Sequence, residues 1–208
     1  AGDGDLDRLA TALVDAVRRR HLLVWSSDLE TQEAWEEVGA AGALEPDSVA
    51  VSLLNRGAEK LDPYLDTTAT LATDAGPGGT TDIDLTYRIA SRAPTTGPAY
   101  QIGPNVDGLA AGGHRAIVVV DLPAGATDVT LEGAKLTLRG GDGPAQVVAG
   151  QVDVGPGATV EVSVHARLPA SSTSLVIEPS ARIPPTRWTI DGHEYRLDVR
   201  RRVPLRSR

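Results

Sequence analysis

Apolar and polar residues alternate with a period of two along most of the chain after residue 47, which is typical of β-strands. In the first such stretch, Val49, Val51 and Leu53 share one face of a strand predicted over 48–54. The residues between them are barely polar, so we expect both faces of this strand to be covered. A polar turn over 55–60 and a second strand from residue 61 then predict a hairpin.

The same alternation continues between turns rich in glycine and proline. Further strands are predicted over 61–74, 81–91, 114–122, 127–139, 146–154, 158–168, 173–179, 187–190 and 194–200. Many short strands at this spacing are typical of an antiparallel β-sandwich, and we expect an Ig-like sandwich over 47–208. The interval 92–113 has no periodicity and is interpreted either as a functional loop or as a plain crossover.

The residues before 47 follow a helical period instead. Leu6, Leu9 and Leu13 recur at helical spacing, which predicts an amphipathic helix that buries this face and ends near the arginines at 18–20. A short apolar strand is expected over 21–26. A second helix is expected from a cap at 27–28 to Gly39.

These patterns together predict an α+β fold that is mainly β. A helix–strand–helix unit is expected over 1–46, followed by the antiparallel Ig-like sandwich over 47–208. No apolar run approaches the roughly 18 residues of a membrane span, so we expect none within this chain. The chain begins without Met, and we interpret it as part of a longer protein.

The amino-acid composition excludes several kinds of chemical site and argues against one class of partner. The 208 residues include no cysteine, which excludes disulfides, a thiolate nucleophile and Cys-ligated zinc or iron–sulfur sites. The formal net charge of −8 argues against general nucleic-acid binding, which requires cations that neutralise phosphates.

No catalytic or cofactor motif is present. The four histidines lie far apart and none has metal-ligand spacing, so we expect no metal site and no cofactor. No nucleophile elbow, phosphate loop or dinucleotide fingerprint follows a predicted strand. We therefore predict no catalytic residue. The histidines are His21, His114, His165 and His193.

One polar row is a candidate ligand-binding site. Asn55, Lys60, Asp62 and Tyr64 follow the first strand, and Tyr100 is a notable side chain of the 92–113 interval. A small binding patch is one interpretation. The alternative is structural: Asn55 closes the turn, and an exposed Lys60–Asp62 pair contributes about 0–1 kcal/mol.

Arginines cluster at the C-terminal end, at 200–202, Arg206 and Arg208. Such a cluster suits an anionic polymer or membrane surface, or else a solvated tail.

Several runs along the chain form a recognisable set: RHLLVWS at 20–26, Asp28 with Gln32, Gly39 with Gly42, Asn55 with 60–62 and Tyr64, 178–180, 184–185 and 187–188. Together these runs resemble the C-terminal part of a bacterial envelope family called "domain of unknown function 4012". Glu59 and Pro63 depart from the family's pattern.

The resemblance implies a bacterial, mostly actinobacterial, protein with an upstream membrane helix and with this part outside the cytoplasm. It implies no established activity. The family's upstream region is loosely similar to the LytR-CpsA-Psr phosphotransferases, which attach polymers to peptidoglycan, but their arginine-rich, metal-using site has no counterpart here.

We therefore expect a non-catalytic extracytoplasmic domain of a cell-envelope protein, with a scaffolding or interaction role. Its expected partner is envelope polysaccharide or another envelope protein. One alternative is a glycan-binding module, which exposure of Trp188 or Tyr100 would favour. A second is a fragment of a cell-wall polymer transferase, which a cleft of converging carboxylates and arginines would favour.

Overall fold

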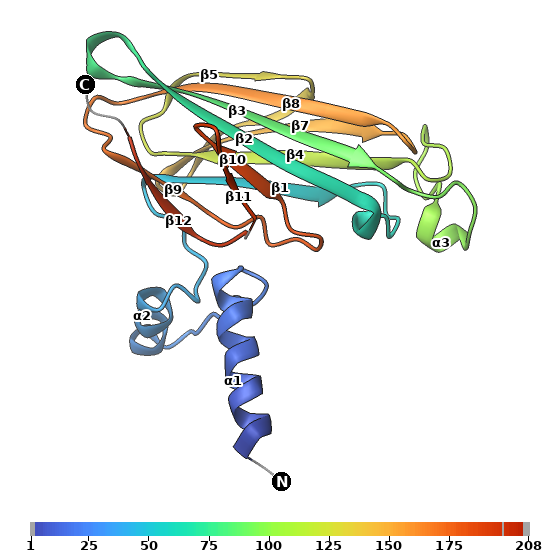
Figure 1. Cartoon of the computed structure of the whole chain (residues 1–208), viewed down its shortest axis with the longest axis horizontal. Helices are drawn as coiled ribbons and strands as arrows, with labels where there is room; N and C mark the ends of the chain where they lie inside the picture. Colours follow the sequence, from blue (N-terminus) through green and yellow to red (C-terminus); the bar gives the residue numbers. More distant parts are fainter. Residues whose placement is uncertain (1–2, 197, 206–208) are drawn as a thin grey trace.

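The structure, a computed structural model, describes residues 3–196 and 198–205. Two helices form an N-terminal arm (residues 3–44) that projects from a larger β-body (residues 45–205), as Figure 1 shows. The fold is α+β and mainly β, as predicted from the period of the apolar residues.

Helix α1 (Asp3–Arg18) ends at the first of the arginines at 18–20, as the sequence predicted. Arg20 has a left-handed backbone with φ of 59°, and its N–H donates to the carbonyl of Val17 at 2.9 Å. The next N–H, of His21, donates to the carbonyl of Ala16 at 2.8 Å. This pair of bonds is a Schellman termination with arginine where glycine is usual.

Helix α2 (Leu29–Glu37) begins at the predicted cap, because the Asp28 carboxylate accepts from the Thr31 N–H at 2.9 Å. The strand expected over 21–26 is wrong. Among the residues that the structure describes, only Val24 of this stretch bonds across, from its N–H to the carbonyl of Ala40 at 2.9 Å, and no neighbouring strand completes a ladder.

In the part of the chain that the structure describes, the β-body consists of two six-stranded sheets. The first sheet has the order β12-β9-β1-β4-β7-β6, and the second has the order β11-β10-β2-β3-β8-β5. The strands are β1 (Ser48–Asn55), β2 (Leu65–Ala75), β3 (Thr81–Ser91), β4 (His114–Leu122), β5 (Thr127–Glu132), β6 (Lys135–Asp142), β7 (Ala145–Val154), β8 (Thr159–Leu168), β9 (Ser174–Ile177), β10 (Arg187–Ile190), β11 (His193–Tyr195) and β12 (Arg201–Pro204).

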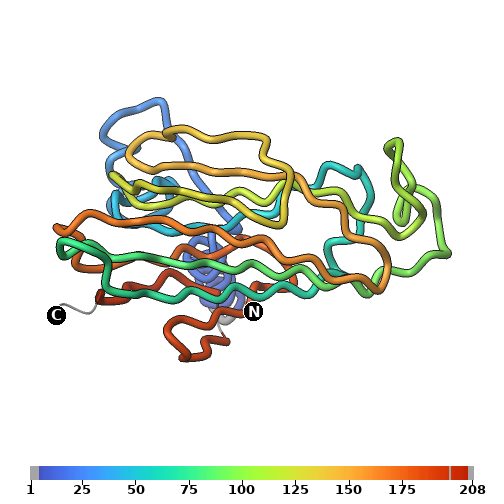
Figure 2. The backbone as a smooth tube through the Cα atoms, turned by 90° about the horizontal axis from the view of Figure 1, so that it is seen from above, coloured from blue at the N-terminus to red at the C-terminus, as the bar shows by residue number. Residues whose placement is uncertain are grey.

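A single large core lies between the sheets, which run as two layers in Figure 2. Alternate residues of each strand enter it, such as Val118 and Val120 of β4 from the first sheet and Leu85 and Tyr87 of β3 from the second. Full burial of one such side chain contributes about 1.5–3 kcal/mol. The core is complete without any residue of the arm.

The expected hairpin between the strands over 48–54 and from 61 is wrong. Strand β1 pairs with β4 in the first sheet, and β2 pairs with β3 in the second. The second strand begins only at Leu65, because residues Asp62–Tyr64 form a 3₁₀ turn with Pro63 in it. Residues 56–64 thus carry the chain from one sheet to the other.

Two more predicted strands divide between sheets. The strand over 127–139 splits at Gly133 into β5 and β6. Gly133 has φ of 77°, and a Cβ there would lie 2.0 Å from the carbonyl oxygen of Glu161. The strand over 194–200 is replaced by β11 in the second sheet and β12 in the first.

The sheets are mixed, whereas the sequence predicted antiparallel ones. Strand β9 runs parallel to β1, and β10 runs parallel to β2. The segment 178–186 crosses between the sheets beside the 56–64 connection, so the later strands run in the same direction as their neighbours. Arg182 ties the two crossings together by donating to the carbonyls of Leu65 at 3.2 Å and Asp62 at 3.3 Å.

Candidate functional site

The turn after β1 is closed by Asn55. Its side-chain oxygen accepts from the N–H groups of Gly57 at 2.9 Å and Ala58 at 3.0 Å, and its amide donates to the carbonyl of Glu59 at 2.8 Å. These bonds use the amide within the turn. The structural interpretation of Asn55 is therefore the one that the geometry fits.

The 92–113 interval meets this turn and forms with it one end of the β-body, called the loop end (residues 55–64 and 92–113; Figures 1 and 2). The Lys60 N–H donates to the carbonyl of Gln101 at 2.8 Å, and the Asn105 side chain donates to the carbonyl of Ala58 at 2.9 Å. The short helix α3 (Ala99–Ile102) buries Ile102 beside Leu61. The interval is thus a packed segment with its own small core.

The candidate side chains gather at the loop end but not in one row. Lys60 is exposed, Asp62 is half-buried in the 3₁₀ turn, and Tyr64 is 41% exposed. No Lys60–Asp62 ion pair forms among the described residues, because the strand that would have aligned them starts later. Tyr100 of α3 is 66% exposed at the same end.

Sequence reasoning missed a buried acid–histidine pair behind this surface. The Glu59 carboxylate contacts Nδ1 of His114, and both residues are at most 1% exposed. Gly57 makes room for the pair, since a Cβ there would lie 1.8 Å from Oε2 of Glu59. Oε2 of Glu59 and Nε2 of His114 have no hydrogen-bond partner among the described residues. The pair joins the turn to the start of β4 and is closed off from solvent.

A charge pair anchors the far side of the loop end. Arg115 of β4 donates to both carboxylate oxygens of Asp153 at 2.7 Å and to the carbonyl of Asp107 at 3.1 Å. These hydrogen bonds lower the pKa of the Asp153 carboxyl. One arginine thus holds the 92–113 interval against the first sheet.

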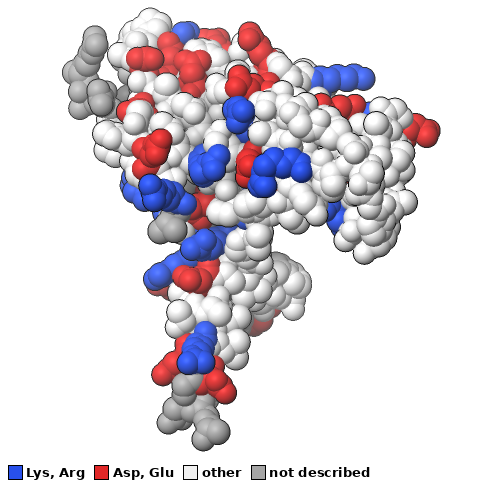
Figure 3. All heavy atoms as spheres, turned by 45° about the vertical axis from the view of Figure 1, so that its right-hand side comes forward, with Lys and Arg blue, Asp and Glu red and all other residues white. Residues whose placement is uncertain are grey.

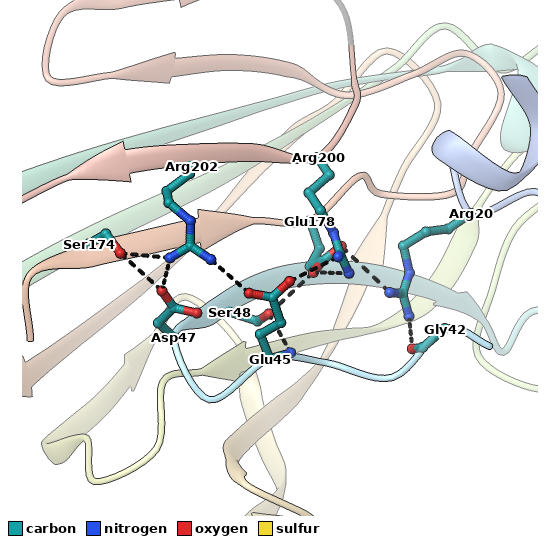
Figure 4. A network of polar contacts seen from close by, with 9 residues as sticks. All are labelled: Arg20, Gly42, Glu45, Asp47, Ser48, Ser174, Glu178, Arg200 and Arg202. Carbon is teal, nitrogen blue, oxygen red and sulfur yellow. Dashed lines mark hydrogen bonds and ion pairs between the residues drawn. The ribbon is translucent and has the colours of Figure 1, made fainter. Parts of the chain in front are cut away.

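A second polar cluster lies where the arm joins the β-body (Figure 4). Glu178, only 1% exposed, accepts from Ser48 at 3.2 Å and Arg200 at 2.8 Å, and lies 3.5 Å from a nitrogen of Arg20. Arg20 also donates to the carbonyl of Gly42 at 2.6 Å. Arg20 is thus the polar link between the arm and the first sheet.

The cluster extends along β12. Arg200 contacts Glu45 at 3.0 Å, while Arg202 contacts Glu45 at 2.7 Å and also pairs with Asp47. Residues 200–202 are therefore not a free tail, although Arg200 and Arg202 are exposed, and Arg201 stacks over the ring of Tyr195 at 4.0 Å. Arg206 and Arg208 lie outside the described residues.

Carboxylates and arginines converge here, as a polymer transferase fragment would require. Each carboxylate of the cluster is already paired with an arginine, and Ser48 and Ser174 complete the bonds to Glu178 and Asp47. A cavity of about 440 Å³ adjoins the cluster and is lined by Arg18, Arg19 and Arg200 among others. Ion pairs of this kind hold segments together, and the cavity marks the seam between arm and β-body.

The arm exposes the apolar residues that the sequence predicted to be buried. Leu6, Leu9, Leu13 and Val14 of α1 are 66%, 56%, 47% and 49% exposed. No other helix or strand of the described chain packs along α1, so the expected burial of this face is wrong. Beyond α1, Trp25 is 75% exposed.

The tryptophans bear on the glycan-binding alternative. Trp188 is buried at 4% exposure, whereas Tyr100 is 66% exposed, and exposure of either residue was expected to favour that alternative. Among the described residues, no helix is long and apolar enough to cross a membrane, and no three His, Asp or Glu side chains gather as metal ligands would.

No protein-family model and no curated protein matches this sequence. Among solved structures, the chain is similar to a Legionella pneumophila protein described as a putative nutrient binding protein, at 9% identity and a TM-score of 0.34. The match covers 69% of this chain and 54% of that one, so the chain spans about half the length of that protein. A likeness at this level carries no argument about fold or function.

Proposed function

We propose that this chain is a non-catalytic interaction domain of an extracytoplasmic cell-envelope protein. The β-body, an Ig-like sandwich in this proposal, is the rigid support, and the arm is the docking element. The observation that carries the proposal is the exposed apolar face of α1 beside a core that is complete without it. The resemblance of residues 20–64 to the envelope family supports the location.

Physical chemistry favours a partner for this face. An isolated helix of 16 residues is only marginally stable in water, and helices in proteins depend on packing of their apolar face. Contiguous exposed apolar residues on a soluble domain are typical of interaction sites. A covering partner would stabilise α1 and remove that surface from water.

Site-specific photo-crosslinking in cells that produce the protein tests the docking role. Benzoylphenylalanine in place of Leu9 is expected to give adducts with one defined polypeptide. The same group in place of Thr70, which is exposed on β2, is the matched control and is expected to give none. Equal labelling from both positions, or no adduct from Leu9, would overturn the proposal.

The location is tested separately. The chain has no cysteine, so a single Thr70→Cys variant carries the only thiol of these residues. A membrane-impermeant maleimide is expected to label it in intact cells as fully as in lysed cells. Labelling only after lysis would contradict the extracytoplasmic location.

Glycan binding at the loop end is the second candidate function. Tyr64 and Tyr100 expose aromatic rings at the same end of the β-body, and such rings combine apolar faces with a polar tip. Peptidoglycan and envelope-polysaccharide fragments would be titrated against the chain. Tyr100→Ala is expected to weaken saturable binding about tenfold, the loss of about 1.4 kcal/mol. Trp25 is an exposed aromatic residue on the arm, and Trp25→Ala is the control that should leave glycan affinity unchanged. Equal losses of affinity in both variants would rule out the loop end as the glycan-binding site.

A further inference from the structure

We infer that α1 pairs in antiparallel orientation with α1 of a second copy of this chain. The inference rests on the proposed docking role of the arm and names its partner. Four features of the described residues carry it: the spacing of the apolar residues, the distribution of charge along α1, small residues at its middle, and the open space around it.

The apolar residues of α1 have the spacing of a helix–helix seam. Leu6, Leu9, Leu13 and Ala16 are separated by three, four and three residues, which places them on the a and d positions of a heptad. The three leucines are each about half exposed or more. A second helix laid along this seam would cover all of them.

Charge selects the antiparallel orientation. Asp5 flanks the seam at the start of α1, and Arg19 flanks it on the same side just past the end. In an antiparallel pair that aligns Leu9 with Leu13 of the other copy, Asp5 lies opposite Arg19 of that copy, and the pairing occurs twice. In a parallel pair Asp5 would lie opposite Ala10 of the other copy, so this attraction would be lost, and the acidic starts of the two helices would lie at the same end, which is unfavourable.

The middle of α1 allows close approach. Ala10 and Ala12 flank the seam on its two sides at the point where the two-fold axis would pass. Small side chains at a crossing bring the helix axes together. This places Ala12 of one copy beside Ala12 of the other.

The rest of the molecule leaves the seam open. Figure 1 shows α1 projecting from the sheets, and Figure 3 shows uncharged surface between the charged residues near its tip and the basic and acidic residues at the junction. The two β-bodies would lie at opposite ends of a helix pair about 24 Å long. A pair of this size buries little surface, so a dissociation constant on the order of micromolar is expected.

The charge also disfavours a lipid surface as the occupant. Interfacial helices carry a polar face rich in Lys and Arg. The polar face of α1 carries Asp5, Asp7 and Asp15 against Arg8 and Arg18.

Sedimentation of the purified full chain over a concentration series tests the pairing. Asp5→Arg and Arg19→Asp are each expected to weaken the dimer about tenfold, because attraction becomes repulsion at both ends. The double variant Asp5→Arg/Arg19→Asp should regain wild-type affinity, as should a mixture of the two single variants. Failure of both to recover would overturn the antiparallel pairing.

Leu9→Asp should abolish the dimer without shifting the unfolding transition. Leu138→Asp is the matched control, since Leu138 is 55% exposed on the edge strand β6. If Leu138→Asp dissociates the dimer and Leu9→Asp does not, the copies meet through β6 and the inference fails.

Disulfide trapping tests the position of the axis, because the chain has no cysteine of its own. Ala12→Cys is expected to form a linked dimer under mild oxidation, and Thr11→Cys, on the outer face, is not. A chain that stays monomeric while Leu9 crosslinks to a different polypeptide in cells would overturn this inference and leave the proposed function standing. If the chain stays monomeric and Leu9 also gives no crosslinked adduct, both the pairing of α1 and the proposed docking role are overturned.

Discussion

The arm and the β-body use the same kind of residue in opposite ways. Leu85 of β3 is 1% exposed, whereas Leu9 of α1 is 56% exposed, although both belong to a regular apolar pattern. The difference lies in what each element faces: β3 lies across from a second sheet, whereas α1 faces no other element of the described chain. An amphipathic pattern therefore shows that a face needs a cover, and not that the same chain supplies it.

The largest expected effect is in the β-body, at the buried acid–histidine pair. His114→Leu leaves the Glu59 carboxyl group buried without its partner, and removal of one member of such a pair costs about 3–5 kcal/mol. Urea denaturation followed by tryptophan fluorescence measures the loss, since Trp188 is the buried one of the three tryptophans. Glu59→Leu together with His114→Leu should recover most of it. A loss below about 1 kcal/mol for the single variant would mean that the carboxyl group finds another partner.

Substitution of one leucine in each region compares how much the β-body and the arm contribute to the free energy of unfolding. Leu85→Ala is expected to lower the free energy of unfolding by about 2–5 kcal/mol, because it leaves a cavity in the core. Leu9→Ala should change it by less than about 0.5 kcal/mol when measured at concentrations where the chain is monomeric. Equal losses in denaturant titrations would show that α1 already packs on the β-body.

Loss of Arg20, which links the arm to the β-body, is expected to loosen the junction between them more than it lowers the stability of the whole chain. Arg20→Ala removes the bonds to Glu178 and Gly42, while Arg200 and Ser48 still hold Glu178. Limited proteolysis should cleave between arm and β-body several times faster, with a change in global stability of about 0.5–1.5 kcal/mol, because Glu178 keeps its other partners. Arg8→Ala, on the exposed part of α1, is the control and should not change the cleavage rate.

The smallest effects concern two carboxyl groups of the first sheet. Burial, and then the charge of Asp142, raise the pKa of Asp121, whereas hydrogen bonds from Arg115 lower the pKa of Asp153. The stabilising contribution of Asp153 is thus present at neutral pH and is lost as pH falls through its folded pKa. The charge of Asp121 costs stability at neutral pH, and that cost disappears on acidification.

NMR titration of the carboxyl carbons of Asp121 and Asp153 measures the direction of both pKa shifts in one experiment. At pH 7, Asp121→Asn should slightly raise the free energy of unfolding and Asp153→Asn should slightly lower it. Effects of the same sign would contradict the assigned causes.

Regular elements were predictable where local chemistry decides them. Strand β3 and strand β4 have the predicted bounds, because alternation and glycine-rich turns define both ends. The choice of sheet was not predictable. Nothing local to 127–139 signals that the chain changes sheets except Gly133, whose neighbour Glu161 is distant in sequence.

The candidate site was likewise predictable only where its contacts are local in sequence. The turn-closing role of Asn55 depends on residues within four positions and was among the interpretations of the sequence. The Glu59–His114 pair joins residues 55 positions apart, and no local pattern relates them. The only available signals were a glycine two residues before Glu59 and a histidine at the start of an apolar strand.

The parallel pairing of β9 with β1 has a consequence for how this chain reaches its folded state. Ser48 at the start of β1 bonds to Glu178, 130 positions later. During synthesis, one side of β1 therefore stays unpaired until residues 174–177 have emerged, and uncovered strand edges are prone to association with other chains. Contacts this distant in sequence also slow folding. The β-body is thus a late-closing structure, because β1 gains its second neighbour more than a hundred residues after it is made.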